Sequence, residues 1–149
     1  MDVTIVTTSR PETTATVTRG AARLLAALGY APLVEVTLPN GRRADLMALG
    51  PKGQIFIVEV KSGVEDFRVD LKWPEYHPYC DAFAFAVAPE FPREMLPDEP
   101  GLIVADGFGG AILRDAPVTP LAGARRKALT LAFARLAALR AAGMVATVL

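Results

Sequence analysis

The sequence RRADLMALGPKGQIFIVEVK, residues 42–61, decides how this chain folds. Two apolar runs within it flank Gly50-Pro51-Lys52-Gly53, a turn sequence that predicts a β-hairpin. Successive side chains of a strand point to opposite faces, so Glu59 and Lys61 share one face of the second strand. Burying a glutamate and a lysine on so apolar a strand costs free energy unless they have partners or a chemical task. The hairpin is therefore the first place to look for a site.

Helices and further strands are predicted on both sides of this hairpin. Apolar residues at three- and four-residue steps predict the helices, and short apolar runs between Gly and Pro predict the strands. In chain order we expect a helix over 15–28, strands over 33–38, 43–49 and 54–61, a helix over about 64–73 that Pro74 ends, a buried strand over 81–88, strands over 102–105 and 111–113, and a helix over 121–142. This order predicts an α/β fold with an αβββαβ core, a mixed sheet flanked by helices, an extra β-hairpin and a C-terminal helix. Residues 1–14, rich in threonine and containing Pro11, are expected to form a flexible segment before a single domain over 15–149.

The composition excludes several kinds of site. The chain has 149 residues, of which 52% are hydrophobic and 21% charged, as expected for one globular domain. One cysteine and one histidine exclude an internal disulfide, a four-cysteine zinc site and a metal site with two histidines. The N-terminus lacks the apolar run of a signal peptide, and two arginines make the most apolar stretch, 128–149, a poor membrane span. We therefore expect a cytoplasmic protein that does not bind membranes.

The hairpin brings two carboxylates together if its register is the one that pairs Asp45 with Glu59. A slip of one residue would place them on opposite faces of the sheet. Cross-strand neighbours have Cβ atoms about 4.5–5.5 Å apart, and two carboxylates that close repel each other unless a cation lies between them. Hard oxygen ligands select Mg²⁺ or Mn²⁺, and the backbone carbonyl of Val60 could supply a third ligand. Lys61 could then orient a water or neutralise developing negative charge.

Other interpretations of these residues remain open from the spacing alone. Arg43, Asp45, Glu59 and Lys61 would also suit a surface salt-bridge cluster at a sheet edge. Glu35, on the preceding strand, could bind the ion through water or could be an exposed strand residue.

The pattern of Asp45 followed by Glu59-Val60-Lys61, in an αβββαβ order, resembles the PD-(D/E)XK nuclease superfamily. More narrowly, residues 43–87 resemble the MmcB-like bacterial DNA repair family, most specifically in the segment KWPEY at 72–76. The first resemblance implies a restriction-endonuclease-like fold, with Asp45 and Glu59 as metal ligands and Lys61 as the catalytic lysine. The second implies a role in repairing damaged or cross-linked DNA. Ala44 stands where the superfamily's name has proline.

Side chains near the end of the predicted helix over 64–73 are further candidates. In the fold that the resemblance implies, this helix flanks the active site, so Asp70 or Lys72 could contribute there. Surface pairing and helix capping explain the same residues without a chemical role. His77 and Cys80 also suggest a Cys–His nucleophile, but a thiol entering an apolar strand is more often an inert core residue.

Charge is unevenly distributed, although 16 basic and 16 acidic residues balance over the whole chain. The last 34 residues, 116–149, carry five basic residues and no acid. Charge alone fits a solvated basic helix face. Basic residues that open a helix oppose its dipole, however, and this small cost argues for a task such as phosphate contact. The residues expected to contact the DNA backbone are Arg42, Arg43, Arg125, Arg126 and Lys127.

These inferences together predict a DNA repair protein with an Mg²⁺- or Mn²⁺-dependent nuclease site that hydrolyses phosphodiester bonds. The absence of zinc-finger and RNA-binding aromatic signatures predicts backbone contacts with little sequence specificity. An alternative is a DNA-structure-binding module of the same fold that cleaves weakly or not at all. A third is a protein-interaction domain whose Glu-Val-Lys is incidental. The sequence leaves the oligomeric state open.

Overall fold

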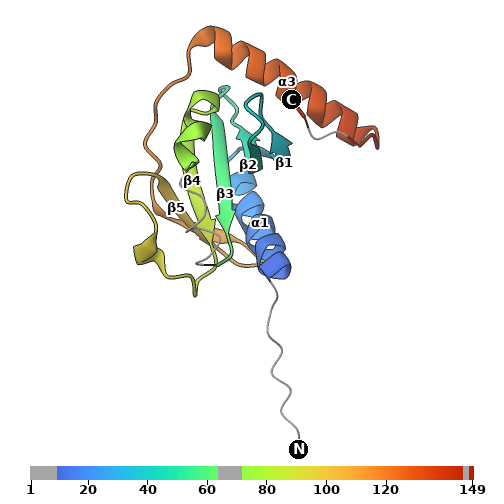
Figure 1. Cartoon of the computed structure of the whole chain (residues 1–149). Coiled ribbons are helices and arrows are strands. Elements are labelled where there is room, and N and C mark those ends of the chain that lie inside the picture. The colour runs from blue at the N-terminus through green and yellow to red at the C-terminus, as the bar shows by residue number, and fades with distance from the viewer. Residues whose placement is uncertain (1–9, 64–71, 146–147) are drawn as a thin grey trace, which may run out of the picture.

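The computed structural model of the protein describes residues 10–63, 72–145 and 148–149. Within them, a six-stranded mixed sheet has the strand order β1-β2-β3-β4-β5-β6 (Figure 1). The pairs β1–β2, β2–β3 and β5–β6 are antiparallel, whereas β3–β4 and β4–β5 are parallel. The predicted α/β class and mixed sheet are confirmed. The strands are β1 (Ala31–Thr37), β2 (Arg43–Leu49), β3 (Ile55–Lys61), β4 (Ala82–Val87), β5 (Gly101–Ala105) and β6 (Gly110–Arg114).

The helices cover both faces of the sheet. On one face, α1 (Arg10–Ala27) packs through Val17, Ala21 and Leu25 against the even-numbered side chains of β3 and β4. On the other face, the odd-numbered side chains of the same strands share one core cluster with the 3-10 helix η1 (Trp73–Tyr79) and with the buried residues of α3 (Gly123–Ala141). A second 3-10 turn, η2 (Arg93–Met95), precedes β5. None of the described helices is long and apolar enough to cross a membrane.

The centre of the sheet is β4, whose six residues are all buried. Its sequence, AFAFAV, is apolar at every position because both faces are covered by helices and both edges by parallel strands. Alanines fill the face toward α1, and the rings of Phe83 and Phe85 fill the face toward η1. Trp73 of η1 stacks on Phe83 with ring centroids 5.9 Å apart, so the 3-10 helix is held against the core.

The start of α1 differs from the sequence prediction. The helix begins at Arg10, so residues 10–14 are helical and not part of a frayed segment. Pro11 suggested a loop, but proline is accommodated in a first helical turn, where its missing N–H has no partner to lose. Glu12 in the same turn has a favourable interaction with the helix dipole.

The segment before β4 also differs from the prediction. Pro74 lies in the first turn of the 3-10 helix η1, which continues to Tyr79. The helix expected over about 64–73 falls mostly on residues 64–71, which lie outside the described residues, and Asp70 lies there too. The described Lys72 stands at the N-cap position of η1.

A buried carboxylate, Asp81, ties three parts of the chain together where β3 begins. Its Oδ2 accepts the Ile55 N–H at 2.8 Å, and its Oδ1 accepts the Leu121 N–H at 2.8 Å. Arg126 of α3 forms a bidentate ion pair with the same carboxylate and also donates to the Gly53 carbonyl at 2.8 Å. Asp81 therefore holds the start of α3, and the segment that leads into it, against the end of the sheet where β3 begins.

Acid is expected to weaken the fold through this carboxylate. Burial alone would raise the pKa of Asp81, but its hydrogen bonds with Arg126, Ile55 and Leu121 lower it from 3.8 to about 2. Because the folded-state pKa is the lower one, this stabilisation is present above about pH 4 and is lost as the pH falls toward 2. The Arg126 side chain is 28% exposed, so solvent screens part of the pair. We expect the difference in free energy of unfolding between wild type and Asp81→Asn to shrink by about 1–2 kcal/mol between about pH 5 and pH 2. Urea denaturation at both pH values measures this difference, and a constant difference would contradict the assignment.

Candidate active site

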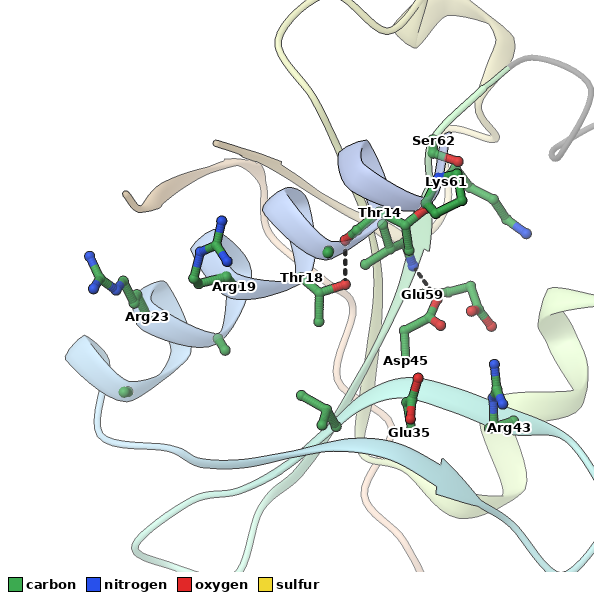
Figure 2. Close-up of a pocket in the computed structure, with 16 residues that line it drawn as sticks. Thr14, Thr18, Arg19, Arg23, Glu35, Arg43, Asp45, Glu59, Lys61 and Ser62 are labelled. Atoms are coloured by element: carbon green, nitrogen blue, oxygen red, sulfur yellow. Dashed lines mark hydrogen bonds between the residues drawn. The ribbon is translucent and has the colours of Figure 1, made fainter. Parts of the chain in front are cut away.

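The register of β2 and β3 brings Asp45 and Glu59 together, as predicted. The ladder pairs Leu46 with Val58 and Met47 with Ile57, and its continuation sets Asp45 opposite Glu59. Beyond the last ladder pair, a side chain and not a main-chain carbonyl accepts the next hydrogen bond from β3. The Oδ2 atom of Asp45 accepts the Val60 N–H at 2.7 Å (Figure 2). The carboxylate of Asp45 is thereby fixed beside the Glu-Val-Lys segment.

Glu59 is a buried acid in an unfavourable environment for its charge. It is 7% exposed. Burial raises the pKa of Glu59 to about 9, helped by a hydrogen bond with Asp45 and by the negative charge of Asp45. Two carboxylates crowded in a place of low polarity resist simultaneous ionisation, and a cation between them would remove that conflict. A cation bound at this pair would therefore stabilise the ionised forms of both carboxylates.

Lys61 lies on the same strand and is 4% exposed. Its positive charge acts on Glu59 in the direction that favours the ionised carboxylate. A lysine kept from water usually requires nearby polar partners, and Glu59 on the same strand is close enough for its charge to interact with that of Lys61. The three predicted catalytic side chains thus gather at the end of β3.

Tyr76 of η1 also belongs to this cluster, although it was not among the site residues predicted from the sequence. Its ring is buried and stacks on Phe83 at 5.3 Å, and its hydroxyl donates to the Arg43 carbonyl at 3.0 Å. A hydrogen bond between Tyr76 and Glu59 acts against the rise in the pKa of that acid. Tyr76 stands between Glu75 and His77, so its sequence neighbours gave no signal of burial, which follows from the packing of η1 on the sheet.

A cavity of about 1180 Å³ opens at these residues. One wall is α1, and the other consists of β1, β2 and the end of β3 (Figure 2). The α1 wall presents small apolar side chains, two threonines and two arginines. The polar side chains lining the cavity are Thr14, Thr18, Arg19, Arg23, Glu35, Arg43, Asp45, Glu59, Lys61 and Ser62.

The arginines of α1 were missed as candidate site residues. Arg19 and Arg23 lie one turn apart, so both can face the same side of the helix. The four-residue spacing was visible in the sequence, but the face that meets the sheet was not. Their placement in the cavity wall follows from how α1 docks on the sheet.

Glu35 lines the cavity from β1 and has an unusual backbone. Its φ is 51°, in the left-handed region that residues other than glycine adopt at a cost. It lies between the ladder pairs Val34–Leu46 and Val36–Ala44, level with Asp45 on the neighbouring strand. Arg140 of α3 donates to its carbonyl at 2.8 Å, which helps to hold this conformation.

Of the basic residues predicted to contact DNA, Arg43 is exposed and lines the cavity. Arg42 forms an ion pair with Glu75 at 2.5 Å. The remaining three open α3, at the end of the sheet where β3 begins, whereas Lys61 ends that strand (Figure 1). The structure therefore does not bring these three residues to the acids.

Each basic residue at the start of α3 has its own surroundings. Arg125 donates to the Pro78 carbonyl at 3.2 Å and lies 5.1 Å from the centre of the Tyr79 ring. Arg126 forms an ion pair with Asp81, whereas Lys127 is exposed. Lys72, also exposed, does not line the cavity in the described part of the chain.

The donor atoms at the end of β3 fit a hard divalent cation. Asp45 and Glu59 offer carboxylate oxygens, and Val60, which also lines the cavity, offers a backbone carbonyl. Among the described residues there is no cluster of three or more His, Cys, Asp or Glu side chains that could hold a metal. A cation here would therefore take two carboxylates, a main-chain oxygen and water, a set typical of Mg²⁺.

Cys80 has the properties of a core residue. It is buried, and burial, followed by the charge of Asp81, raises its pKa to about 12. Its thiol donates to the Tyr76 carbonyl at 3.4 Å. A protonated, inaccessible thiol is a poor nucleophile, so the burial of Cys80 supports its interpretation as a core residue.

Known proteins resemble this chain over nearly its whole length. The model of the family described as DNA repair protein MmcB-like matches residues 1–147. The solved structure of the SPO1766 protein of unknown function from Silicibacter pomeroyi is similar, with 45% identity, a TM-score of 0.83, and coverage of 86% of this chain and 88% of that one. No protein of curated function matches. The extent of the family match shows that the chain belongs to the MmcB-like DNA repair family.

Proposed function

We propose that this protein is a metal-dependent DNA phosphodiesterase of the PD-(D/E)XK type that acts in DNA repair. The observation that carries the proposal is the contact between Asp45 and Glu59 at the end of β3, with Lys61 buried beside them. The family supports DNA as the substrate, since its members are described as DNA repair proteins.

The proposed ligands are the carboxylates of Asp45 and Glu59 and the carbonyl of Val60, with Glu35 acting through water. A bound Mg²⁺ or Mn²⁺ would lower the pKa of a water molecule and offset negative charge on the phosphoryl oxygens. The chain contributes the rest of the site. Asp45 is aligned by the Val60 N–H, and Tyr76 forms a hydrogen bond with Glu59.

Lys61 is proposed to act on the reacting groups. Its ammonium donates to the attacking water or to a phosphate oxygen, so that it orients the nucleophile and neutralises charge that develops in the transition state. Its burial keeps competing water away and strengthens this interaction. Asp70, which lies outside the described residues, and Lys72, which does not line the cavity, remain proposed contributors from the segment that follows β3.

The DNA backbone is proposed to enter along α1. Arg19, Arg23 and Arg43 line the cavity and carry the positive charge that a phosphodiester strand needs. Arg42, Arg125 and Lys127 are proposed as peripheral contacts on longer DNA. Arg126 is better explained by its ion pair with Asp81.

The direct test is cleavage by the purified chain. We expect Mn²⁺ or Mg²⁺ to support cutting of at least one DNA form among single-stranded, nicked, gapped, flapped and fully paired oligonucleotides, and EDTA to stop it. Gel electrophoresis of end-labelled DNA measures the products. If no form is cut with either metal while DNA is still bound, the protein is the non-cleaving DNA-structure-binding module and the phosphodiesterase proposal is wrong.

A further inference from the structure

The turn between β5 and β6 presents an aromatic side chain to solvent. Phe108 is 85% exposed. A single exposed apolar residue is common and needs no explanation by itself. Phe108 differs from other exposed apolar residues, such as Leu131 on α3, in its surroundings. Its backbone is held by hydrogen bonds, and two arginines lie against the same turn.

The backbone beneath Phe108 is fixed by Asp106. The Oδ1 atom of Asp106 accepts the N–H of Phe108 at 2.8 Å and that of Gly109 at 3.1 Å. The N–H of Asp106 in turn donates to the Gly109 carbonyl at 2.9 Å. These backbone bonds also lower the pKa of Asp106, whose negative charge is directed into the turn. The phenyl ring is thus held outward by a turn with few alternative conformations.

This turn is docked tightly on α1. A Cβ atom added at Gly20 would lie 1.8 Å from the Asp106 carbonyl oxygen, so only glycine permits the approach. Arg19 donates to the Gly107 carbonyl at 3.4 Å, and Arg23 donates to the Phe108 carbonyl at 3.3 Å. The same two arginines line the active-site cavity, on the side of Figure 2 away from Asp45 and Glu59.

An exposed aromatic ring near two guanidinium groups is well suited to binding a single nucleic-acid strand. Bases stack on exposed aromatic rings whatever their identity, while arginines bind the phosphates between them. Each guanidinium has five N–H donors, and the contacts with the turn use one from each arginine. In duplex DNA the bases are already stacked on one another, so an unpaired base is the chemistry that this ring fits.

We propose that Phe108 stacks on an unpaired base of the DNA strand whose phosphates Arg19 and Arg23 hold. The substrate would then have a single-stranded segment beside the bond that is cut. This inference rests on the proposed function and names its substrate class.

The test is binding of the full chain to fluorescent oligonucleotides in EDTA, measured by anisotropy. Phe108→Ala is expected to weaken binding to a single-stranded oligonucleotide about 5- to 100-fold and to change binding to the matching duplex less than about twofold. Phe108→Trp should retain the wild-type affinity. Val118→Ala, which removes another exposed apolar side chain, is the matched control and should change neither affinity.

Several results would overturn the proposal. If wild type binds DNA but Phe108→Ala leaves single-strand affinity unchanged, or lowers both affinities equally, stacking is wrong while the proposed function stands. If Phe108→Ala instead changes the elution volume of the DNA-free protein, the ring belongs to a protein interface. Wild type that binds no oligonucleotide would contradict the proposed function as well.

Discussion

Asp45→Asn is expected to abolish metal-dependent DNA cleavage, with a loss of at least about a thousandfold in rate. The change removes the negative charge that a cation needs but keeps an oxygen that can accept the Val60 N–H. It also removes the charge that disfavours ionisation of Glu59, so the fold should be as stable as wild type. Single-turnover cleavage and thermal denaturation measure the two properties separately.

The matched control for this variant is Glu75→Gln. Glu75 is an acid with a side chain that is 50% exposed, and it pairs with Arg42 outside the cavity. Its substitution should leave the cleavage rate within about twofold, because an exposed ion pair contributes little. Cleavage by Asp45→Asn within tenfold of the wild-type rate would show that the acid pair is not the catalytic centre.

Asp81→Ala is expected to lower the free energy of unfolding by about 3–5 kcal/mol. The substitution leaves the N–H groups of Ile55 and Leu121 without their acceptor and leaves the Arg126 guanidinium without its acid. Because these groups come from three separate segments, the loss should loosen α3 as well as the start of β3. Urea denaturation followed by circular dichroism gives the free energy.

Glu75→Ala separates this effect from the loss of any ion pair. It breaks the exposed contact with Arg42 and should cost about 0.5 kcal/mol or less. A cost below about 1 kcal/mol for Asp81→Ala would mean that the Asp81 cluster does not support the fold.

The hairpin and the central strand were predictable from the sequence because their signals are local. The Gly50–Gly53 turn fixes which runs pair, and the observed β2 has the predicted bounds 43–49. A fully apolar run such as AFAFAV has no solvated face, so it predicts a buried central strand over 81–88, and the observed β4 spans 82–87. Prolines misled the prediction at Pro11 and Pro74, because the residue that breaks a helix interior is also well suited to a first turn.

The candidate site was only partly predictable. Asp45 and Glu59 depend on one register, which a short turn and alternating faces determine. Tyr76 and the arginines of α1 reach the site through the docking of whole helices, and residue spacing does not contain that information. The basic run that opens α3 shows the converse, since a charge cluster in the sequence does not reveal which end of the sheet it will occupy.

The central claim, that the two acids share one divalent cation, is tested most directly by calorimetric titration of Mn²⁺ into wild type and Asp45→Asn. We predict saturable binding by wild type and at least about tenfold weaker binding by the variant. Equal binding by both proteins, or no binding by wild type, would contradict the claim.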